Sequence, residues 1–460
     1  MSWLLVLLGC PAPVESDPPV LVESDVPPLP ETDASPFSSP AEAVDFDPDP
    51  DIVRVSLTAA AFDVDGISQW KYAYNGQVPG PTLRAKVGDT LIVDLENALA
   101  APTTVHWHGV RTPFAMDGVP WMTDPVEPGE TFEYSFVLDR PGTFWYHPHF
   151  DSAGQVDGGL YGVLIVEDPT EPAVDVDVVA VFDSAAESKA DTGLSVMGHG
   201  GGDPHTGGNL LDWLVNGLTE PTLEVPGGTR IRARLLNASN TGYLDLRWPN
   251  ARRIGGDQGL LAAPEDDWAG LVLAPGDRAE VEWLIGGAAF SLVDYPYSLA
   301  GGTALGQEQT LMRVENTSEA DAPDPLPFVW SGALPTPDPG YSDIVWVFQG
   351  EEDTWMINGE QFPDVTIPEV TVGDTVIVEV RNLSSSEHPF HLHGHSFEVL
   401  SVDGVAPELR RIEDTINVAI RGVVRLRFVA DNPGDWMAHC HILPHADGGM
   451  MTILRVNPAG

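Results

Sequence analysis

Apolar and polar residues alternate over short runs along most of the chain from Ile52 onward. Typical runs, at 91–97, 231–237 and 376–382, are bounded by Gly, Pro, Asp or Asn. Because successive side chains of a strand point to opposite faces, this pattern predicts half-buried strands joined by tight turns. No long segment shows the periodicity of an amphipathic helix. We therefore expect an all-β protein.

One pattern of turns and strands occurs three times. An Asn-Gly step at 75, 216 and 358 is followed each time by a short apolar run, a Gly-containing turn and a strand-like run that ends in Asn. The two intervals have the size of a domain. We therefore expect three β-sandwich or barrel domains, over 52–168, 173–316 and 342–457, with 317–341 as a Pro-rich, acidic linker.

The N-terminus, 1–10, is an apolar run closed by Cys10 and is too short to span a bilayer as a helix. It resembles a bacterial lipoprotein signal peptide, in which Cys10 would carry the lipid; a misassigned start or a cleaved secretory signal are the alternatives. Residues 11–51 are rich in proline and acidic residues, which predicts a disordered tether. We expect a protein tethered to the membrane, in the bacterial periplasm or on the cell surface.

The 460 residues carry 69 Asp and Glu against 22 Lys and Arg, a formal charge of −47. Such a surface repels phosphate backbones, so it excludes a basic patch for nucleic acid or anionic lipid. It attracts cations, although solubility or salt tolerance would also explain it. Two cysteines exclude a disulfide scaffold.

Ten of the 13 histidines, together with Cys440, fall in four short motifs of the first and third domains. These motifs are His106-Trp107-His108; His147-Pro148-His149; His388-Pro389-Phe390-His391-Leu392-His393; and His439-Cys440-His441, with His445 and Met450 following.

The His-x-His pairs occupy equivalent positions of the repeat, for example at equal distances from Asn97 and Asn382. Side chains two residues apart on a strand share a face, so four pairs can bring eight imidazoles to one metal cluster between the two domains. The middle domain has Leu246 and Trp248 where the first domain has its first pair. We therefore expect that domain to serve as a spacer.

The third domain carries a second set of ligands that the first domain lacks. Thr103 and Pro148 of the first domain stand where the third has His388 and Cys440. Two imidazoles, a thiolate and a weak axial thioether are the ligands of a blue-copper site. Zinc is the competing metal, but the thioether and the clustered imidazoles favour copper. The set is His388, Cys440, His445 and Met450.

On these motifs, residues 52–457 resemble the three-domain multicopper oxidases of the laccase and bacterial metallo-oxidase type. The resemblance implies three consecutive cupredoxin-like Greek-key domains and four copper ions. The type 1 ion would be held by His388, Cys440, His445 and axial Met450. The type 2 ion would be held by His106 and His391. The two type 3 ions would be held by His108, His147, His149, His393, His439 and His441.

The resemblance also implies an activity. Substrate is oxidised one electron at a time at type 1, and four electrons pass through the Cys-His segment to the cluster that reduces O2 to two waters. Asp117 matches the acid that supplies protons in the family, although an Asp-Gly step also forms turns. Many bacterial members have a second acid where this chain has Pro444, so Asp447 or water would substitute.

Several reductants fit this ligand set. We expect a laccase-like, monomeric oxidase of phenols or aromatic amines; the alternatives are oxidation of Cu(I) or Fe(II), and a non-enzymatic copper-storage or electron-transfer protein. The nine methionines form no Met-rich insertion of the kind found in cuprous oxidases. The glycine-rich run 197–205, with His199 and His205, would bind extra copper or form a flexible loop. His395 is expected to pack beside the site.

Overall fold

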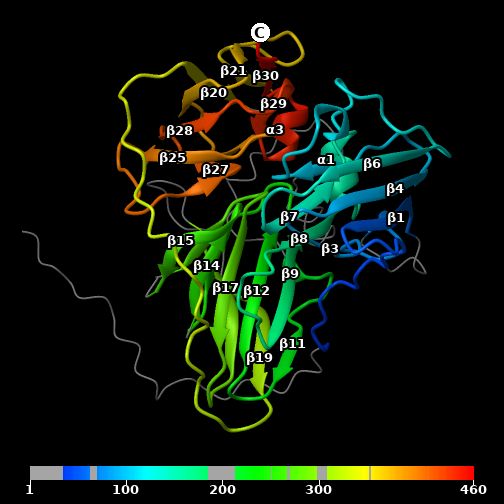
Figure 1. Ribbon diagram of the computed structural model, residues 1–460, viewed down its shortest axis with the longest axis vertical. Helices are drawn as coiled ribbons and strands as arrows, with labels where there is room; N and C mark the ends of the chain where they lie inside the picture. Colours follow the sequence, from blue (N-terminus) through cyan, green and yellow to red (C-terminus); the bar gives the residue numbers. More distant parts are fainter. Residues whose placement is uncertain are drawn as a thin grey trace, which may run out of the picture. The chain divides into compact units, whose positions relative to one another are not determined.

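The strands in the described part of the chain form six sheets, which fall into three consecutive pairs along the sequence (Figure 1). The computed structural model describes residues 35–62, 70–184, 213–249, 251–266, 270–297, 308–351 and 354–460. Helices in these ranges are short, and none is long and apolar enough to cross a membrane. The expected all-β, cupredoxin-like fold is confirmed.

The first pair of sheets uses residues 52–167. One sheet has the order β2 (Tyr72–Tyr74), β1 (Ile52–Ala61), β4 (Thr90–Ala98), β6 (Thr131–Val137). The other has the order β3 (Leu83–Lys86), β8 (Gly162–Glu167), β7 (Gly142–His147), β5 (His106–His108). The connections contain the 3-10 helix η1 (Phe114–Met116) and the helix α1 (Ser152–Asp157). We call this part the first unit.

The middle unit uses residues 176–316. Its larger sheet has the order β10 (Trp213–Val215), β9 (Val176–Ser184), β12 (Arg230–Asn237), β17 (Arg278–Leu284), β14 (Ala251–Gly256), β15 (Gly259–Glu265). Its smaller sheet has the order β11 (Thr222–Val225), β19 (Gln309–Asn316), β18 (Phe290–Tyr295), β13 (Leu244–Arg247), β16 (Leu271–Leu273).

The third unit uses residues 344–457 and repeats the strand order of the middle one. Its larger sheet has the order β21 (Thr354–Ile357), β20 (Ile344–Glu351), β23 (Thr375–Asn382), β28 (Val423–Val429), β25 (Phe397–Val402), β26 (Ile412–Glu413). Its smaller sheet has the order β22 (Glu369–Thr371), β30 (Met451–Asn457), β29 (Gly434–Cys440), β24 (His388–Leu392), β27 (Thr415–Val418). The helix α3 (Leu443–Asp447) lies between β29 and β30.

The repeated asparagines perform the same structural task in each unit. Asn75, Asn216 and Asn358 all have left-handed backbones, with φ of 52°, 52° and 57°, a conformation that asparagine tolerates well. The side-chain oxygen of each accepts a backbone N–H from the first strand of its unit, at 2.7, 2.8 and 2.8 Å. The sequence repeat is therefore also a repeat of hydrogen bonding.

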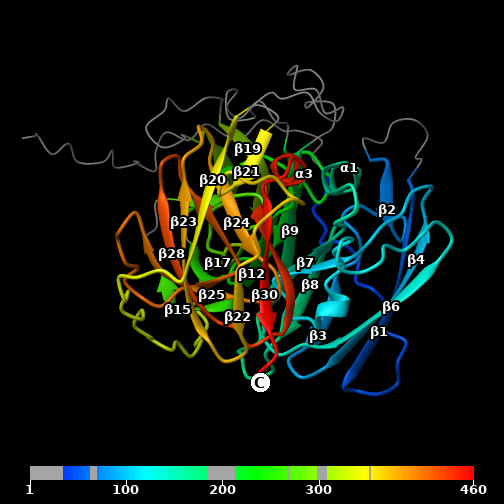
Figure 2. The ribbon, with the colours of Figure 1, turned by 90° about the horizontal axis from the view of Figure 1, so that it is seen from above.

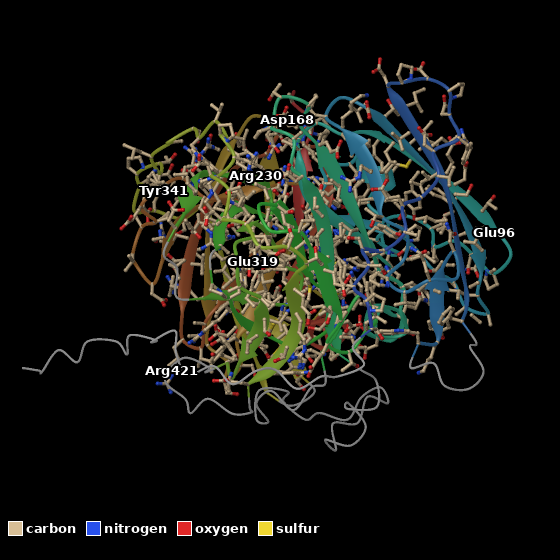
Figure 3. All side chains as sticks on the ribbon, turned by 90° about the horizontal axis from the view of Figure 1, so that it is seen from below. Glu96, Asp168, Arg230, Glu319, Tyr341 and Arg421 are labelled. Carbon is tan, nitrogen blue, oxygen red and sulfur yellow. The ribbon has the colours of Figure 1, made fainter. Side chains whose placement is uncertain are left out.

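Each unit encloses its own apolar core. The burial of β1 alternates residue by residue, as expected for a strand with one face on the core. Trp107, Trp283 and Trp346 are fully buried, one in each of the three cores. Acidic side chains such as Glu96 and Glu319 are exposed and lie on the outside (Figure 3).

The chain before β1 differs from the expected tether. Backbone hydrogen bonds join Phe37 N to Thr222 O at 2.7 Å and Ala43 N to Thr82 O at 2.9 Å. Phe37 packs on the core of the middle unit and Ala43 on that of the first. The expectation of a disordered tether is therefore wrong for 35–51, because apolar side chains between the prolines find cores to cover.

The linker 317–341 has no strand, yet Leu326 and Phe328 are buried against Ile254 of the middle unit. Beyond it, α3 lies beside α1 of the first unit, as Figures 1 and 2 both show. A hydrogen bond from Ala153 N to the Asp447 carboxylate, 3.1 Å long, joins the two helices. The ends of β7 and β29, which precede these helices, carry two of the four histidine motifs.

Candidate metal centres

Eight buried imidazoles meet where the first and third units face each other. Strands β5 and β7 pair His106 with His147, and β24 and β29 pair His391 with His439. Across the junction, His108 stacks on His391 with ring centroids 3.7 Å apart, and His106 on His393 at 3.9 Å. The structure thus brings together all eight histidines that the sequence placed in one cluster.

The ring nitrogens of this cluster form groups within which every pair of atoms is closer than 4.8 Å. One group, His106 with His147 and His149, lies within the first unit, whereas the others named below contain residues of both units. Two groups of three share no residue, and the two remaining imidazoles, His106 and His391, meet in a further group with His108. The two separate groups are His108, His147, His441 and His149, His393, His439.

The inward nitrogens of these rings have the arrangement that a bound metal requires. Among the residues that the structure describes, the buried Nε2 of His106, His147, His149 and His391, and Nδ1 of His108, have no hydrogen-bond partner. Buried polar atoms are almost always paired, so five such nitrogens within one cluster suit the binding of a cation. The Nε2 atoms of His393 and His439 lie only 3.1 Å apart.

The outward nitrogens, in contrast, are held in place. Nδ1 of His106 lies 2.9 Å from the carbonyl oxygen of Asp117, and Nδ1 of His391 lies 2.9 Å from that of Asp414. Nδ1 of His439 lies 2.8 Å from the carbonyl oxygen of Cys440. Such partners fix the ring orientation and tautomer of metal-binding histidines.

Burial also keeps these rings in their neutral, metal-binding form. Loss of hydration, and then the other imidazoles, lower the pKa of His108, His149 and His391 well below the ordinary value. Burial lowers the pKa of His439 to about 4. At neutral pH each of these four rings therefore has a lone pair to offer.

A second group lies on the other face of β29. Cys440 Sγ is 3.4 Å from Nδ1 of His388 and 3.7 Å from Nδ1 of His445, and these two nitrogens are 3.2 Å apart. Met450 is fully buried in the same core. Burial raises the pKa of the Cys440 thiol, so a cation is needed to hold the thiolate. Two nitrogens, a sulfur and a nearby thioether suit copper.

Cys440 links the two groups. Its neighbours His439 and His441 turn their rings into the cluster of eight, while its own sulfur faces His388 and His445. Alternation of side chains along a strand produces this arrangement. The two groups are therefore joined through the backbone of three consecutive residues.

Two carboxylates contact rings of the cluster, one from the first unit and one from the third. Asp117 Oδ2 lies 2.8 Å from Nδ1 of His393, and Asp414 Oδ1 lies 3.0 Å from Nε2 of His108. The side chain of each aspartate thus contacts a histidine of the other unit. The backbone carbonyl of the same aspartate contacts a histidine of its own unit. The sequence reasoning missed Asp414, whose only signal is its place just before the strand that pairs with β24.

The middle unit also reaches the cluster, which corrects its expected role as a spacer. Leu246 is buried in its core and provides no ligand. However, Arg278 forms a fully buried, bidentate ion pair with Asp414, and Gln258 donates to the same carboxylate at 2.6 Å. A side chain at Gly276 would lie 2.9 Å from the ring of His441, so only glycine fits there.

The remaining candidates lie elsewhere. Asp447 is exposed and bonds to α1, and Pro444 is exposed beside it. His395 is buried, with Nδ1 3.3 Å from the carbonyl oxygen of His393. Cys10, His199 and His205 lie outside the described residues.

Comparison with known proteins assigns the chain to a family. Models described as multicopper oxidase match residues 57–171 and 336–460. The chain is 30% identical over 451 residues to Multicopper oxidase MmcO of Mycobacterium tuberculosis, across 87% of this chain and 86% of the relative. It is 31% identical over 404 residues to Multicopper oxidase mco of Staphylococcus aureus, across 83% of each.

Solved structures agree. The multicopper oxidase of Campylobacter jejuni, described as a metallo-oxidase, has a TM-score of 0.77 and 26% identity over 92% of this chain and 95% of its own. A laccase-like multi-copper oxidase from Ochrobactrum sp. has a TM-score of 0.74 and 25% identity over 92% of this chain and all of its own (100%). The chain therefore belongs to the multicopper oxidases.

Proposed function

We propose that this chain is a laccase-like oxidase that takes single electrons from phenols or aromatic amines and uses four of them to reduce O2 to two waters. The observation that carries the proposal is the position of Cys440. Its sulfur belongs to one group of ligands, and the residues on either side of it belong to the other. A group that accepts electrons is thereby joined by backbone to a group built for several metal ions.

Each group has the donors that copper requires, and bound copper would supply one-electron exchange at Cys440 and multi-electron reduction of O2 at the cluster. We assign a type 1 ion to His388, Cys440, His445 and Met450, and a type 2 ion to His106 and His391. We assign one type 3 ion to His108, His147 and His441, and the other to His149, His393 and His439.

Reduction of O2 to water also consumes four protons. Asp117 is buried beside the cluster, with Oδ2 2.8 Å and Oδ1 3.4 Å from the Nδ1 atoms of His393 and His106. We assign to its carboxyl group the transfer of protons to the reduced oxygen. Asp447, which is exposed and bonded to Ala153, is not needed for this assignment.

An aromatic surface beside His445 supports aromatic reductants. Trp355 stacks on the His445 ring with centroids 3.7 Å apart. Ala446, the next residue, belongs to an apolar cluster on which Met122 and Phe362 pack. Trp121 is 51% exposed and meets the edge of Phe362 at 4.9 Å. A planar, apolar donor can stack on the exposed Trp121 ring, which is connected through Phe362 and the cluster of Ala446 to the neighbourhood of His445.

Metal-ion oxidation is the second candidate. The net charge of −47 would concentrate cations, and a structurally similar protein is described as a metallo-oxidase.

One experiment separates the candidates. Copper-loaded protein is assayed in an oxygen electrode with 2,6-dimethoxyphenol and, separately, with Cu(I) or Fe(II) under air. We expect O2 consumption with the phenol. Fast oxidation of Cu(I) or Fe(II) without phenol turnover would replace the proposed reductant by the metal ion. Blue colour without any O2 consumption would leave an electron-transfer protein.

A further inference from the structure

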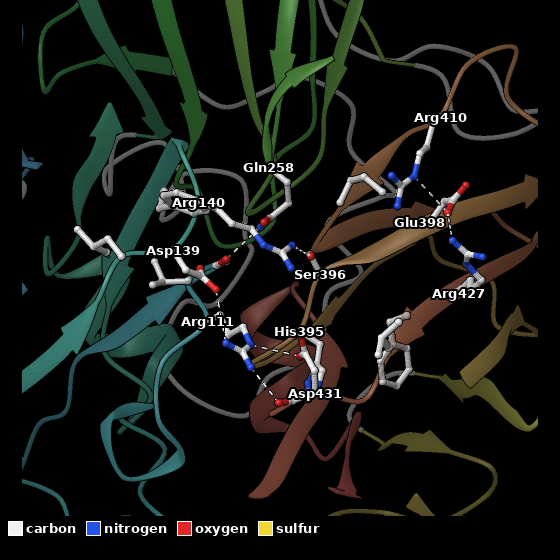
Figure 4. A pocket seen from close by; sticks show the side chains of 17 residues that line it. Arg111, Asp139, Arg140, Gln258, His395, Ser396, Glu398, Arg410, Arg427 and Asp431 are labelled. Carbon is white, nitrogen blue, oxygen red and sulfur yellow. Dashed lines mark hydrogen bonds and ion pairs between the residues drawn. The ribbon is translucent and has the colours of Figure 1, made fainter. Parts of the chain in front are cut away.

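A cavity of about 500 Å³ lies where the three units meet (Figure 4). Arg111 and Arg140 of the first unit, Gln258 of the middle unit, and His395 and Ser396 of the third line it. A volume of this size holds a small organic or inorganic ion with its water.

Arginine is concentrated around this cavity. Four of the 22 basic residues line it, namely Arg111, Arg140, Arg410 and Arg427, against three acidic residues, Asp139, Glu398 and Asp431. In a chain that has three times more acidic than basic residues, this local excess of positive charge is unusual. It favours an anion as the occupant.

The guanidinium groups also have donors to spare. Arg410 and Arg427 share one carboxylate, Glu398, which already accepts two hydrogen bonds from Thr336. Arg140, in the part of the chain that the structure describes, has the hydroxyl oxygen of Ser396 as its partner and no carboxylate. A guanidinium has five N–H donors in a planar fork that matches an oxyanion.

His395 supplies the opposite kind of group. It is only 6% exposed, and its Nδ1 faces the carbonyl oxygen of His393 at 3.3 Å, a contact that requires a proton on Nδ1. No described residue is a hydrogen-bond partner of its buried Nε2, which in the neutral ring accepts a hydrogen bond. An O–H group on the occupant would satisfy it.

We propose that this cavity binds a small oxyanion that carries a hydroxyl group, of which inorganic phosphate is the simplest. The arginines, Arg140 first, bind the charged oxygens, and His395 Nε2 accepts the hydroxyl. Gln258 forms the wall toward the cluster, since its amide nitrogen bonds to Gly109 O at 3.0 Å and to the Asp414 carboxylate. Binding of the anion at this site does not require copper.

The test is titration calorimetry of the full chain at constant ionic strength, with phosphate and with sulfate, which has no hydroxyl at neutral pH. Copper-loaded and copper-free protein should bind phosphate equally, and sulfate more weakly. Arg140→Gln should lower the affinity for phosphate about tenfold or more, because a charged hydrogen bond is lost. His395→Phe should lower the affinity for phosphate to that for sulfate and leave the affinity for sulfate unchanged.

Arg421→Gln is the matched control, because Arg421 is exposed and lies outside the cavity (Figure 3). It should bind phosphate like the unaltered protein. Phosphate binding that is absent, that requires copper, or that survives Arg140→Gln would overturn the proposal. Equal affinity for sulfate and phosphate would overturn the role of His395. These results concern binding alone, so a failed oxidase assay would leave them standing.

Discussion

Arg278 of the middle unit and Asp414 of the third form a bidentate ion pair in which both side chains are completely buried. The same carboxylate lies 3.0 Å from Nε2 of His108 in the first unit. One pair of residues therefore connects all three units at the cluster of histidines. The middle unit, whose described residues provide no ligand, is thereby linked to the orientation of the His108 ring.

Replacement of Arg278 by Met should destabilise the protein strongly. Removal of one partner of a buried pair leaves an uncompensated charge and costs about 3–5 kcal/mol. Arg278→Lys should recover part of this, because lysine restores the charge but not the planar fork. Urea unfolding of the metal-free chain measures the loss, and copper content after loading measures its effect on the site.

Arg247→Met serves as the control for Arg278, since Arg247 is half exposed and pairs with Asp245 on its own strand. Its effect on unfolding should be within about 1 kcal/mol. If both variants unfold at the same urea concentration, the buried pair does not stabilise the junction.

Asp117→Asn should slow the reduction of O2 by about a hundredfold while leaving the blue colour of the Cys440 site intact. Asparagine keeps the size and one oxygen near His393 but cannot deliver a proton. Stopped-flow reoxidation of the reduced protein isolates this step from substrate oxidation. Asp447→Asn should reoxidise at the normal rate; a comparable loss there would place the proton path through α3 instead.

Most of the candidate site was predictable from the sequence, because His-x-His pairs in equivalent repeat positions share a face of a strand. His106 and His391 could be aligned before any fold was known, since each follows the same strand end at the same distance. Asp414, Arg278 and Gln258 could not be found in this way. They meet only through packing of three units, and no local pattern records which side chains face across such a junction.

The N-terminal segment shows the opposite limit. Its composition is typical of disorder. However, composition does not show which single residues contact a core, as Phe37 and Ala43 do. A few apolar residues and backbone donors are enough to hold 35–51 in place, because the edges of β-sheets offer unpaired carbonyl groups.

Cys440→Ser should abolish both the blue colour and turnover, while the cluster of histidines still binds copper. Serine keeps the shape of cysteine but is a poor ligand for copper at this site. Absorption and paramagnetic resonance spectra, with copper content, test the three parts together. O2 consumption that persists in this variant would contradict the electron path through residues 439–441.

Trp121→Ala should raise KM for 2,6-dimethoxyphenol several-fold and leave kcat nearly unchanged, because the ring offers stacking area but is remote from the reacting bonds. Oxidation of Cu(I) should not respond. Tyr341→Ala removes another exposed aromatic ring, in the linker, and should change neither value. An equal rise of KM in both variants would remove the aromatic surface beside His445 as the docking site.

Asp277→Asn should make the protein more stable than the unaltered chain, and increasingly so as the pH rises. Burial, together with the nearby Glu413, raises the pKa of Asp277 to about 7 in spite of a hydrogen bond from Ala274 N, while the unfolded chain keeps the ordinary value of 3.8. Between these pH values the unfolded state ionises and the folded state holds its proton, so the contribution of Asp277 to stability is greatest below about pH 4 and is lost as the pH rises to about 7.

Asparagine at position 277 keeps the acceptor for Ala274 but cannot ionise. Urea unfolding of both proteins at about pH 4.5 and about pH 8 should show a larger advantage of the variant at the higher pH; an equal difference at the two values would mean that Asp277 ionises alike in the folded and unfolded chain.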